Sequence, residues 1–312
     1  MNFEIVDRIA EIPYRIRPCA RAGTRTWPLT ARDLSRIKIT WPTRHQWAPA
    51  KGINETIKEG LHRLGILRTE ATAQAHKGIV LLDCVVDGHT HKVALDYADK
   101  ENPINEDALA KSGLYLKLQF RADGYSDDRI LRGGYPVTGL DYYRYYRAFR
   151  ARFAGRRSID VLGRFGYTFQ GEYRRRAVEM LAAARDIGFV GNGPKVRYSR
   201  FLREAASARL CLSLPGNGPF THRVAEFLGL GSCMISPRYA TSLNEPLEPG
   251  VHYVVIADDL SDLLEKCRYY LHHDDEREAI ADAGREFFER NLHFDQLASY
   301  YVRNILDRLG TA

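Results

Sequence analysis

The chain has 312 residues, which is long enough for two domains of ordinary size, each with its own core. Hydrophobic residues make up 45% of it and charged residues 27%, as in soluble globular proteins, and no apolar run approaches the roughly 20 residues of a membrane-spanning helix. The formal net charge of +7 suits anionic partners such as nucleotides, membrane surfaces or nucleic acid, although both signs are mixed through most of the chain.

Cysteine and histidine usage excludes several kinds of site. The five cysteines are scattered, odd in number and lack a CxxC pair, so neither a disulfide framework nor a structural zinc site is expected. The ten histidines show no comparable ligand spacing, so we expect no metal site. The first residues contain acidic side chains and no unbroken apolar stretch, unlike a signal peptide, and a cytoplasmic protein is expected.

The first half of the chain alternates apolar runs with amphipathic segments, which predicts an open α/β sheet. Residues 1–35 are rich in Arg and Pro and are expected to wrap the surface. The Asp87-Gly88 pair is typical of a hairpin turn. The expected strands are residues 37–42, 78–87, 90–96 and 112–120, and the expected helices are residues 53–64 and 105–111.

Polar residues follow two of these strands, where ligands of open α/β sheets bind. They are Asp96, Asp99, Lys117, Gln119 and Arg121. A carboxylate at such an edge can serve as a general base that takes a proton from a hydroxyl group. Asp99 can equally cap the turn that follows it.

Residues 140–157 combine six aromatic residues with six arginines. At helical spacing Tyr142, Tyr146, Phe149 and Phe153 form one stripe, which is more typical of a core than of a ligand platform. The arginine face is suited to phosphates or acidic lipid headgroups, and residues 154–157 are a plausible hinge between domains.

The second half again alternates strands and helices, and residues 174–176 form an arginine cluster that is expected to be a solvated helix face. The expected strands are residues 158–166, 209–214, 233–236 and 254–257. The expected helices are residues 172–185, 200–208, 221–230, 260–272, 275–290 and 295–309.

A glycine-rich loop joins the strand at 209–214 to the helix at 221–230. Gly216 and Gly218 lack Cβ atoms, so their backbone N–H groups can approach a ligand, and the helix N-terminus favours an anion such as phosphate. Arg223 can add a bidentate contact, and Glu226, one turn later, can accept from sugar hydroxyl groups. Such loops are also ordinary in doubly wound folds, and Arg and Glu three residues apart are often a solvated salt bridge.

The same stretch resembles the C-terminal domain of exostosin-type glycosyltransferases, in which a "skFCL.P.G" strand and loop precedes "R..EAL..GCIPVI". It is also similar to protein O-glucosyltransferases and, more distantly, to the large GT-B families. The resemblance covers about residues 158–270, and the proline usual after "GC-I" is absent at Ile235-Ser236. The matching residues are Tyr198, Phe201, Leu202, Ser207, Arg209, Leu210, Cys211, Leu212, Pro215, Gly216, Arg223, Glu226, Phe227, Leu228, Gly231, Ser232, Cys233, Met234 and Ile235.

The resemblance implies a GT-B fold, an α/β architecture of two Rossmann-like domains that face a central cleft. Residues 1–155 would bind the acceptor and residues 156–294 the nucleotide-sugar, while residues 295–312 would form a helix that crosses back to the first domain. A sugar would pass from a nucleotide-sugar, most simply a UDP-sugar, to a hydroxyl group without a further cofactor. Gly218 stands where the first of two paired glutamates would be in many retaining enzymes, which favours an inverting enzyme. The reaction is also expected to be metal-independent.

The resemblance also implies roles for individual residues. Asp96 or Asp99 would be the catalytic base, and Lys117, Gln119 and Arg121 would bind the acceptor. The residues expected to bind the donor are Arg164, Tyr198, Gly216, Asn217, Gly218, Pro219, Phe220, Thr221, His222, Arg223 and Glu226.

The acceptor stays open at this point. A glycan or lipid-linked sugar fits a basic surface with peripheral membrane contact, and a hydroxymethylated base in DNA fits the sequence isoelectric point near 9.1. The same architecture also serves nucleotide-sugar epimerases and non-catalytic proteins that bind sugar nucleotides.

Overall fold

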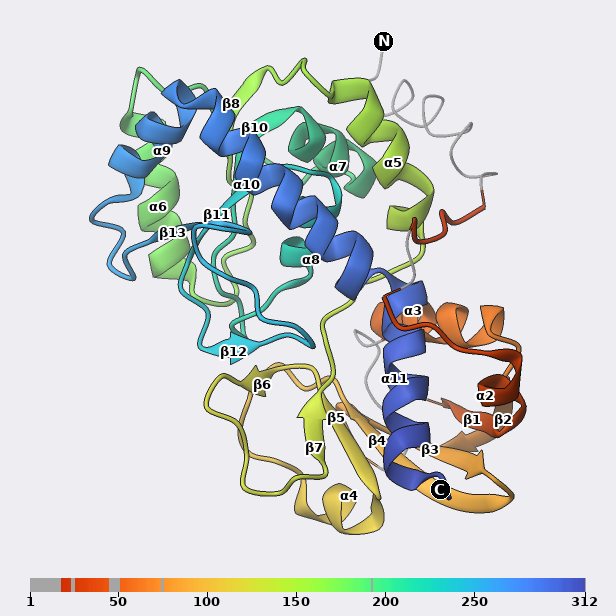
Figure 1. Ribbon diagram of the computed structural model, residues 1–312. Coiled ribbons are helices and arrows are strands. Elements are labelled where there is room, and N and C mark those ends of the chain that lie inside the picture. Colours follow the sequence, from red (N-terminus) through yellow and green to blue (C-terminus); the bar gives the residue numbers. More distant parts are fainter. Residues whose placement is uncertain (1–17, 24–25, 45–50, 74–75, 192, 312) are drawn as a thin grey trace.

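The computed structural model describes residues 18–23, 26–44, 51–73, 76–191 and 193–311, and most of the segment expected to wrap the surface lies outside them. Figure 1 shows two α/β halves, each built around a sheet. This confirms the expected α/β class and its two sheets. None of the helices in the described residues is long and apolar enough to cross a membrane.

The first sheet is mixed, in the order β2-β1-β3-β4-β5-β7. Its centre is antiparallel, because β3 pairs in that sense with both β1 and β4, whereas the outer pairs are parallel. The Asp87-Gly88 hairpin is confirmed, with φ of 50° and 86°. The strands are β1 (Ile37–Arg44), β2 (Leu67–Ala73), β3 (Ile79–Val86), β4 (His89–Asp96), β5 (Leu114–Lys117) and β7 (Ile130–Arg132).

Three helices accompany this sheet: α2 (Ala31–Ser35), α3 (Lys51–Arg63) and α4 (Glu106–Lys111). The next helix, α5 (Asp141–Phe153), lies against α7 (Tyr198–Ser207) of the second half (Figure 1). The expected apolar face of α3 is confirmed, since Ile53, Ile57 and Leu61 are buried. The aromatic stripe of α5 is also core, as Tyr142, Tyr146 and Phe149 are buried.

The second sheet is parallel throughout, in the order β13-β11-β10-β8-β9, and helices follow its strands as in doubly wound folds. Its strands are β8 (Ile159–Leu162), β9 (Phe189–Val190), β10 (Ala208–Leu212), β11 (Cys233–Pro237) and β13 (Val254–Ile256). Its helices are α6 (Gly171–Ala183), α7 (Tyr198–Ser207), α8 (His222–Gly229), α9 (Leu263–His272) and α10 (Asp274–Phe287).

The two halves are joined along several contacts. The short strand β6 (Phe120–Arg121) pairs with β12 (Thr241–Ser242). A π-helical turn, η2 (Phe288–Leu292), leads into α11 (Phe294–Leu309), which lies beside α3 (Figure 1). Gly60 of α3 makes this packing possible, because a Cβ there would lie 2.5 Å from the Phe294 carbonyl oxygen.

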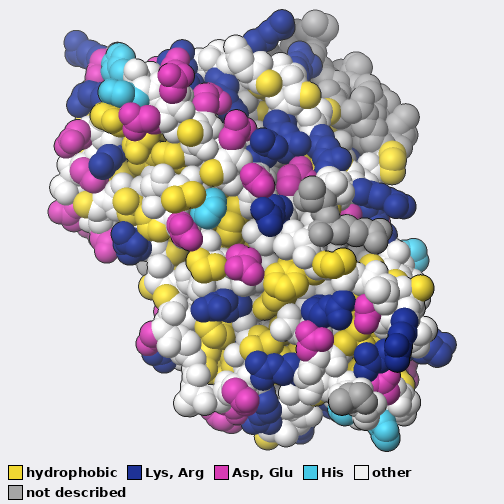
Figure 2. Space-filling view, in the orientation of Figure 1, with side chains coloured by type: hydrophobic (Ala, Val, Ile, Leu, Met, Phe, Trp, Pro, Cys, Tyr) yellow, Lys and Arg dark blue, Asp and Glu magenta, His cyan; other side chains and the backbone are white. Residues whose placement is uncertain are grey.

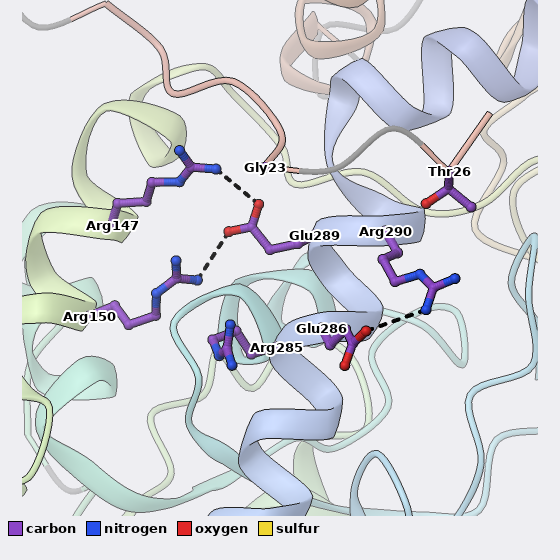
Figure 3. A pocket seen from close by; sticks show the side chains of 8 residues that line it. All are labelled: Gly23, Thr26, Arg147, Arg150, Arg285, Glu286, Glu289 and Arg290. Carbon is purple, nitrogen blue, oxygen red and sulfur yellow. Dashed lines mark hydrogen bonds and ion pairs between the residues drawn. The ribbon is translucent and has the colours of Figure 1, made fainter. Parts of the chain in front are cut away.

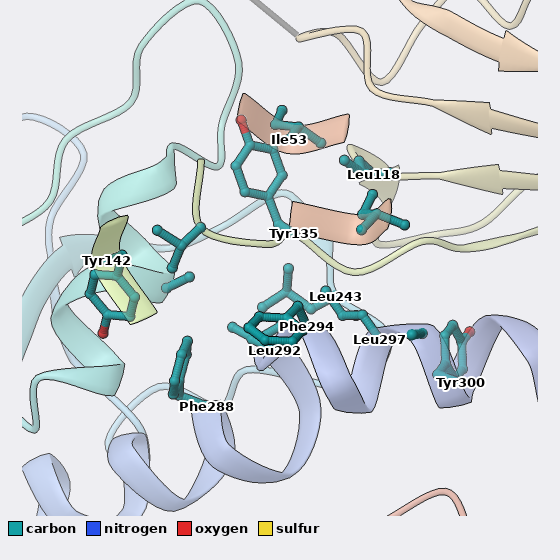
Figure 4. Packing of buried hydrophobic residues seen from close by; sticks show 14 of the residues in the cluster. Ile53, Leu118, Tyr135, Tyr142, Leu243, Phe288, Leu292, Phe294, Leu297 and Tyr300 are labelled. Atoms are coloured by element: carbon teal, nitrogen blue, oxygen red, sulfur yellow. The ribbon is translucent and has the colours of Figure 1, made fainter. Parts of the chain in front are cut away.

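One apolar cluster runs through both halves. Figure 4 shows Tyr142 of α5 and Phe288 of η2 at one end of this cluster, and Leu297 and Tyr300 of α11 further along it. The aromatic rings pack closely: the centroids of Tyr142 and Phe288 are 5.8 Å apart. The core is therefore continuous across the junction of the halves.

Candidate functional site

A pocket of about 530 Å³ opens at the carboxyl edge of the second sheet. We call it the sheet-edge pocket. Three groups of residues line it: Arg164, Phe165 and Gly166 after β8; Gly191, Gly193, Pro194, Lys195 and Val196 after β9; and Tyr198, Phe201, His222 and Arg223 from the first turns of α7 and α8. Its volume and its position at a strand edge are those of small-molecule sites in α/β proteins.

Arg223 is the cation best placed to meet a ligand. Its guanidinium carbon lies 4.8 Å from the centre of the Phe165 ring and 5.5 Å from that of Phe201. It makes no hydrogen bond or ion pair with any described residue. Burial lowers its pKa to about 10, so it is still charged at neutral pH. Its N–H donors are therefore available to an anion.

Tyr198, which lines the pocket, forms a pair with the buried Glu226 behind it. The Tyr198 hydroxyl donates a 2.6 Å hydrogen bond to Glu226 Oε1, whereas Oε2 is buried without a partner among the described residues. Burial raises the pKa of Glu226 to about 7, against the opposing effects of the Tyr198 hydrogen bond and the Arg223 charge. An acceptor oxygen without a donor is costly unless a ligand or water supplies one.

The other predicted charged groups of the pocket are less free. Arg164 donates to both carboxylate oxygens of Glu204, at 2.6 and 3.2 Å, and Glu204 also pairs with Arg200. His222 stands at the pocket surface, where loss of hydration, followed by the charges of Arg223 and Arg174, lowers its pKa to about 4. It is therefore neutral at pH 7.

Arg174 is buried, so the expectation of a solvated arginine face is wrong for this residue. Its guanidinium donates to the carbonyl oxygens of Gly166, Pro215 and Leu214, at 2.8, 3.0 and 3.2 Å. It thereby ties the loop after β8 to the loop after β10. Arg175 and Arg176 of the same helix are exposed, as expected.

The glycine loop, residues 215–220, docks on the first half of the molecule. Gly218 packs there because a Cβ on it would lie 2.0 Å from the Asp99 carbonyl oxygen. The Asn217 side chain donates a 2.9 Å hydrogen bond to Asp99 Oδ2. Gln119 holds Phe220 by two bonds, one to its carbonyl oxygen at 2.9 Å and one from its N–H at 3.2 Å.

The expectation that this loop presents free amides to a ligand is corrected for two of its residues, Gly216 and Phe220. The Phe220 amide is used by Gln119, and the Gly216 amide donates to the Gly218 carbonyl oxygen at 3.0 Å. Thr221, the N-cap of α8, makes no capping bond, and its buried Oγ1 has no partner among the described residues. Pro219 is half-buried in the loop.

Asp96 and Lys117 form a buried ion pair of 2.8 Å inside the first half. The carboxylate also accepts from the Tyr115 hydroxyl at 2.6 Å and from the Ala98 N–H at 2.8 Å. Three donors and no solvent access leave Asp96 unable to meet a substrate in this structure. The assignments of Asp96 as a base and of Lys117 as an acceptor contact are therefore corrected: both residues have a structural role.

The predicted acceptor residues are not brought together. Gln119 is buried in its contact with Phe220, and Arg121 pairs with Asp123 near the β6–β12 ladder. Asp99 is half-buried at the junction, and its second carboxylate oxygen has no hydrogen-bond partner among the described residues. In the described ranges, no group of three or more His, Cys, Asp and Glu side chains is placed to hold a metal ion.

Sequence reasoning missed the aromatic walls of the pocket. Phe165 and Phe201 position the Arg223 guanidinium, and Phe201 lies one turn after Tyr198 on α7. That i, i+3 spacing was the available signal. No such signal in the sequence pointed to Gly191. A side chain is excluded there because a Cβ would lie 2.0 Å from an atom of the Phe189 ring.

Comparisons with known proteins bear on the same region. Residues 157–303, just under half of the chain, match a family model described as glycosyl transferase-like. Protein O-glucosyltransferase 2 of Danio rerio is 46% identical over 55 residues, which are 18% of this chain and 11% of that protein. The match thus spans about a tenth of the curated relative's length.

Solved structures show weaker likeness. Anabaena Alr3699/HepE, solved in complex with UDP-glucose, is 11% identical with a TM-score of 0.42, over 65% of this chain and 66% of that one. The pneumococcal O-GlcNAc transferase GtfA, solved with UDP and GlcNAc, is 13% identical with a TM-score of 0.29, over 48% and 35%. The residues that line the sheet-edge pocket all lie within residues 157–303, the part of the chain that matches the glycosyl transferase-like family model.

Proposed function

We propose that this protein is a glycosyltransferase that binds a nucleotide-sugar in the sheet-edge pocket and transfers the sugar to a hydroxyl group. The observation that carries this proposal is the unpaired, aromatic-flanked guanidinium of Arg223 at the first turn of α8, inside a glycosyl transferase-like domain. A diphosphate would take the donors of Arg223 and the positive end of the helix. Arg223 would then stabilise the negative charge that grows on the departing diphosphate.

The remaining donor contacts follow from the pocket lining. Phe165 and Phe201 offer ring faces beside the phosphate position, and Tyr198 lies between the pocket and Glu226. The unpartnered Glu226 Oε2 is suited to a hydroxyl group of the donor once the Tyr198 ring shifts. The donor is proposed to be a UDP-sugar, used as co-substrate without a further cofactor, and the name of the curated relative supports a glucosyl-type sugar.

The reaction is proposed to be a metal-independent displacement with inversion, in which Arg223 compensates the diphosphate charge. Of the two carboxylates considered as the base, Asp99 is the better candidate, because Asp96 is enclosed by three donors. Asp99 lies where the halves meet, so an acceptor hydroxyl would enter there. The acceptor would be a glycan, a lipid-linked sugar or a hydroxymethylated DNA base, in a cytoplasmic protein whose cysteines are free.

Isothermal titration with UDP-, GDP-, ADP-, dTDP- and CMP-sugars tests the donor site. Arg223→Met should weaken binding of the preferred donor by about tenfold to a hundredfold, the cost of a charge-assisted contact. Arg200→Gln is the matched control, because Arg200 is a paired arginine on α7 that does not line the pocket. Failure of every nucleotide-sugar to bind would overturn the proposal.

Turnover separates the enzyme from the alternatives. A glycosyltransferase releases free UDP in proportion to added acceptor, whereas an epimerase converts the donor with no acceptor present. A non-catalytic protein binds the donor without converting it. Asp99→Asn should lower the rate of UDP release with little change in donor affinity, because the amide oxygen can still accept from Asn217 but the side chain can no longer take the acceptor proton.

A further inference from the structure

A second pocket, of about 570 Å³, lies away from the sheet-edge pocket and shares no residue with it. We call it the arginine pocket, and it is defined by Arg147 and Arg150 of α5, Arg285 of α10, and Arg290 and Glu289 of η2 (Figure 3). In Figure 2, Lys and Arg side chains gather on this face between α5 and α10. Nothing in the proposed sugar transfer uses these residues.

Arg147 and Arg150 are held in place by hydrogen bonds before any ligand binds. Glu289 accepts from Arg147 through Oε2 and from Arg150 through Oε1, both at 3.1 Å. The Tyr146 hydroxyl takes a 2.9 Å bond from Arg147 Nε, and its ring lies 5.5 Å from the Arg150 guanidinium carbon. One carboxylate therefore serves two cations, so a positive charge is left uncompensated on a rigid frame.

The other two arginines add charge at the rim. Arg285 is bound only through Nε, to Asp282 at 3.1 Å, so its two terminal nitrogens have no acceptor among the described residues. Arg290 Nη1 bonds Glu286 at 3.3 Å. The Cδ atoms of Arg150 and Arg285 each lie 3.5 Å from where a Cβ of Gly231 would be, so the two side chains approach the same point from different helices.

The lining of the arginine pocket differs in charge from the lining of a neighbouring hollow. The arginine pocket has four arginines against two glutamates, whereas the hollow beyond the Arg290–Glu286 pair is lined by Glu245, Glu248 and Glu286 with Arg290 as its cation. A ligand with negative charge is therefore drawn to the α5 side. Several guanidinium groups with free N–H donors in a concave site suit the oxygens of phosphate, which they bind in bidentate fashion.

We infer that the arginine pocket is a second anion site, which binds a phosphate- or diphosphate-bearing ligand independently of the sugar-transfer site. An occupant would bridge α5 and η2, the segments through which the chain passes between its two sheets. The phosphate comes either from a free small molecule or from a lipid headgroup, which carries the same chemistry.

Titration of inorganic pyrophosphate at constant ionic strength tests the inference. The titration uses Arg223→Met protein, so that the sheet-edge pocket contributes little. In this background, Arg285→Gln with Arg290→Gln should weaken pyrophosphate binding at least tenfold. Arg268→Gln with Arg308→Gln is the matched control: it removes two ion-paired arginines of similar exposure, 46% and 43% against 39% and 54%, from outside both pockets.

The outcomes are separable from those of the proposed function. Pyrophosphate binding that vanishes with Arg223→Met, or that falls equally in both double variants, overturns the second site and leaves sugar transfer untouched. Binding that persists with Arg223→Met and is lost only with Arg285→Gln and Arg290→Gln supports it, even if no nucleotide-sugar binds. Sedimentation with vesicles of phosphatidylglycerol, compared with phosphatidylcholine, then assigns the phosphate: loss in the same double variant alone supports a headgroup source.

Discussion

The Tyr198 hydroxyl donates to one oxygen of the buried Glu226 carboxylate and leaves the other oxygen without a partner. The two residues come from different helices, α7 and α8, whose first turns line the sheet-edge pocket. Because burial raises the pKa of Glu226 against the effect of this hydrogen bond, the stability of the pocket wall depends on the protonation of Glu226.

Glu226→Gln should change how stability varies with pH. The folded-state pKa is about 7 against an ordinary value of 4.5, so between these values the folded protein holds a proton that the unfolded chain releases. Stability from this group is therefore present below about pH 4.5 and is lost as pH rises through 7, by roughly 3 kcal/mol in total. Urea unfolding at pH 5 to 8 should show this decline in the wild type and a smaller one in the Gln variant; parallel curves would contradict it.

Arg174→Met should weaken both folding and donor binding. It leaves the carbonyl oxygens of Gly166, Leu214 and Pro215 without their buried donor, at a cost of about 3 kcal/mol or more. The loop after β8 would then be free to move, which should raise the dissociation constant of the nucleotide-sugar. Arg176→Gln, on the exposed face of α6, should change unfolding by less than about 0.5 kcal/mol. If the folded Arg174→Met protein bound the donor with unchanged affinity, the hydrogen bonds of Arg174 would not be needed to position the loop after β8.

Gly218→Ala should loosen the junction between the halves. Its Cβ would lie 2.0 Å from the Asp99 carbonyl oxygen, a backbone atom, so the glycine loop must shift at a cost of about 1–3 kcal/mol. Gly166→Ala is the control, because a Cβ there has open space around it. Thermal unfolding measures the difference, and equal melting temperatures for the two variants would contradict this account of the junction.

Lys117→Met should be strongly destabilising, by about 3–5 kcal/mol, because it leaves the Asp96 carboxylate buried without its cation. Adding Asp96→Leu to the same protein should restore much of that loss, since the pair would be replaced by apolar groups. Urea unfolding of the single and double variants measures this recovery. A double variant no more stable than Lys117→Met would mean that the Tyr115 and Ala98 contacts carry the stabilisation instead.

The fold was predictable wherever the apolar pattern is local. The amphipathic spacing of α3 and the apolar run of β3 sufficed, and Asp87-Gly88 indicated the hairpin. Strand β2 escaped prediction because nearly all its side chains are exposed, so it has no alternation, and only its pairing with β1 makes it a strand. Pairing between the backbones of two strands that are distant in the chain produces no periodic pattern of apolar residues.

The site was predictable only in part, for the same reason. Arg223 and Tyr198 stand at helix starts that the sequence indicates, and they do line one pocket. The buried state of Arg174 depends on carbonyl groups in two distant loops, and the contact of Gly218 depends on the backbone of Asp99 in the other half. Every residue type has the same backbone carbonyl group, so contacts to carbonyl oxygens cannot be predicted from a sequence pattern.

The apolar cluster that runs from α5 through η2 into α11 limits how the two halves can be separated. A fragment cut at residue 157 would keep the parallel sheet but expose the surface that Tyr142 and Tyr146 cover, together with the partner face of α11. Such a fragment should aggregate rather than fold, and heating the intact chain should give one cooperative transition. Exchange of the first half between related proteins would succeed only if α5 and α11 are exchanged together with the half against which they pack.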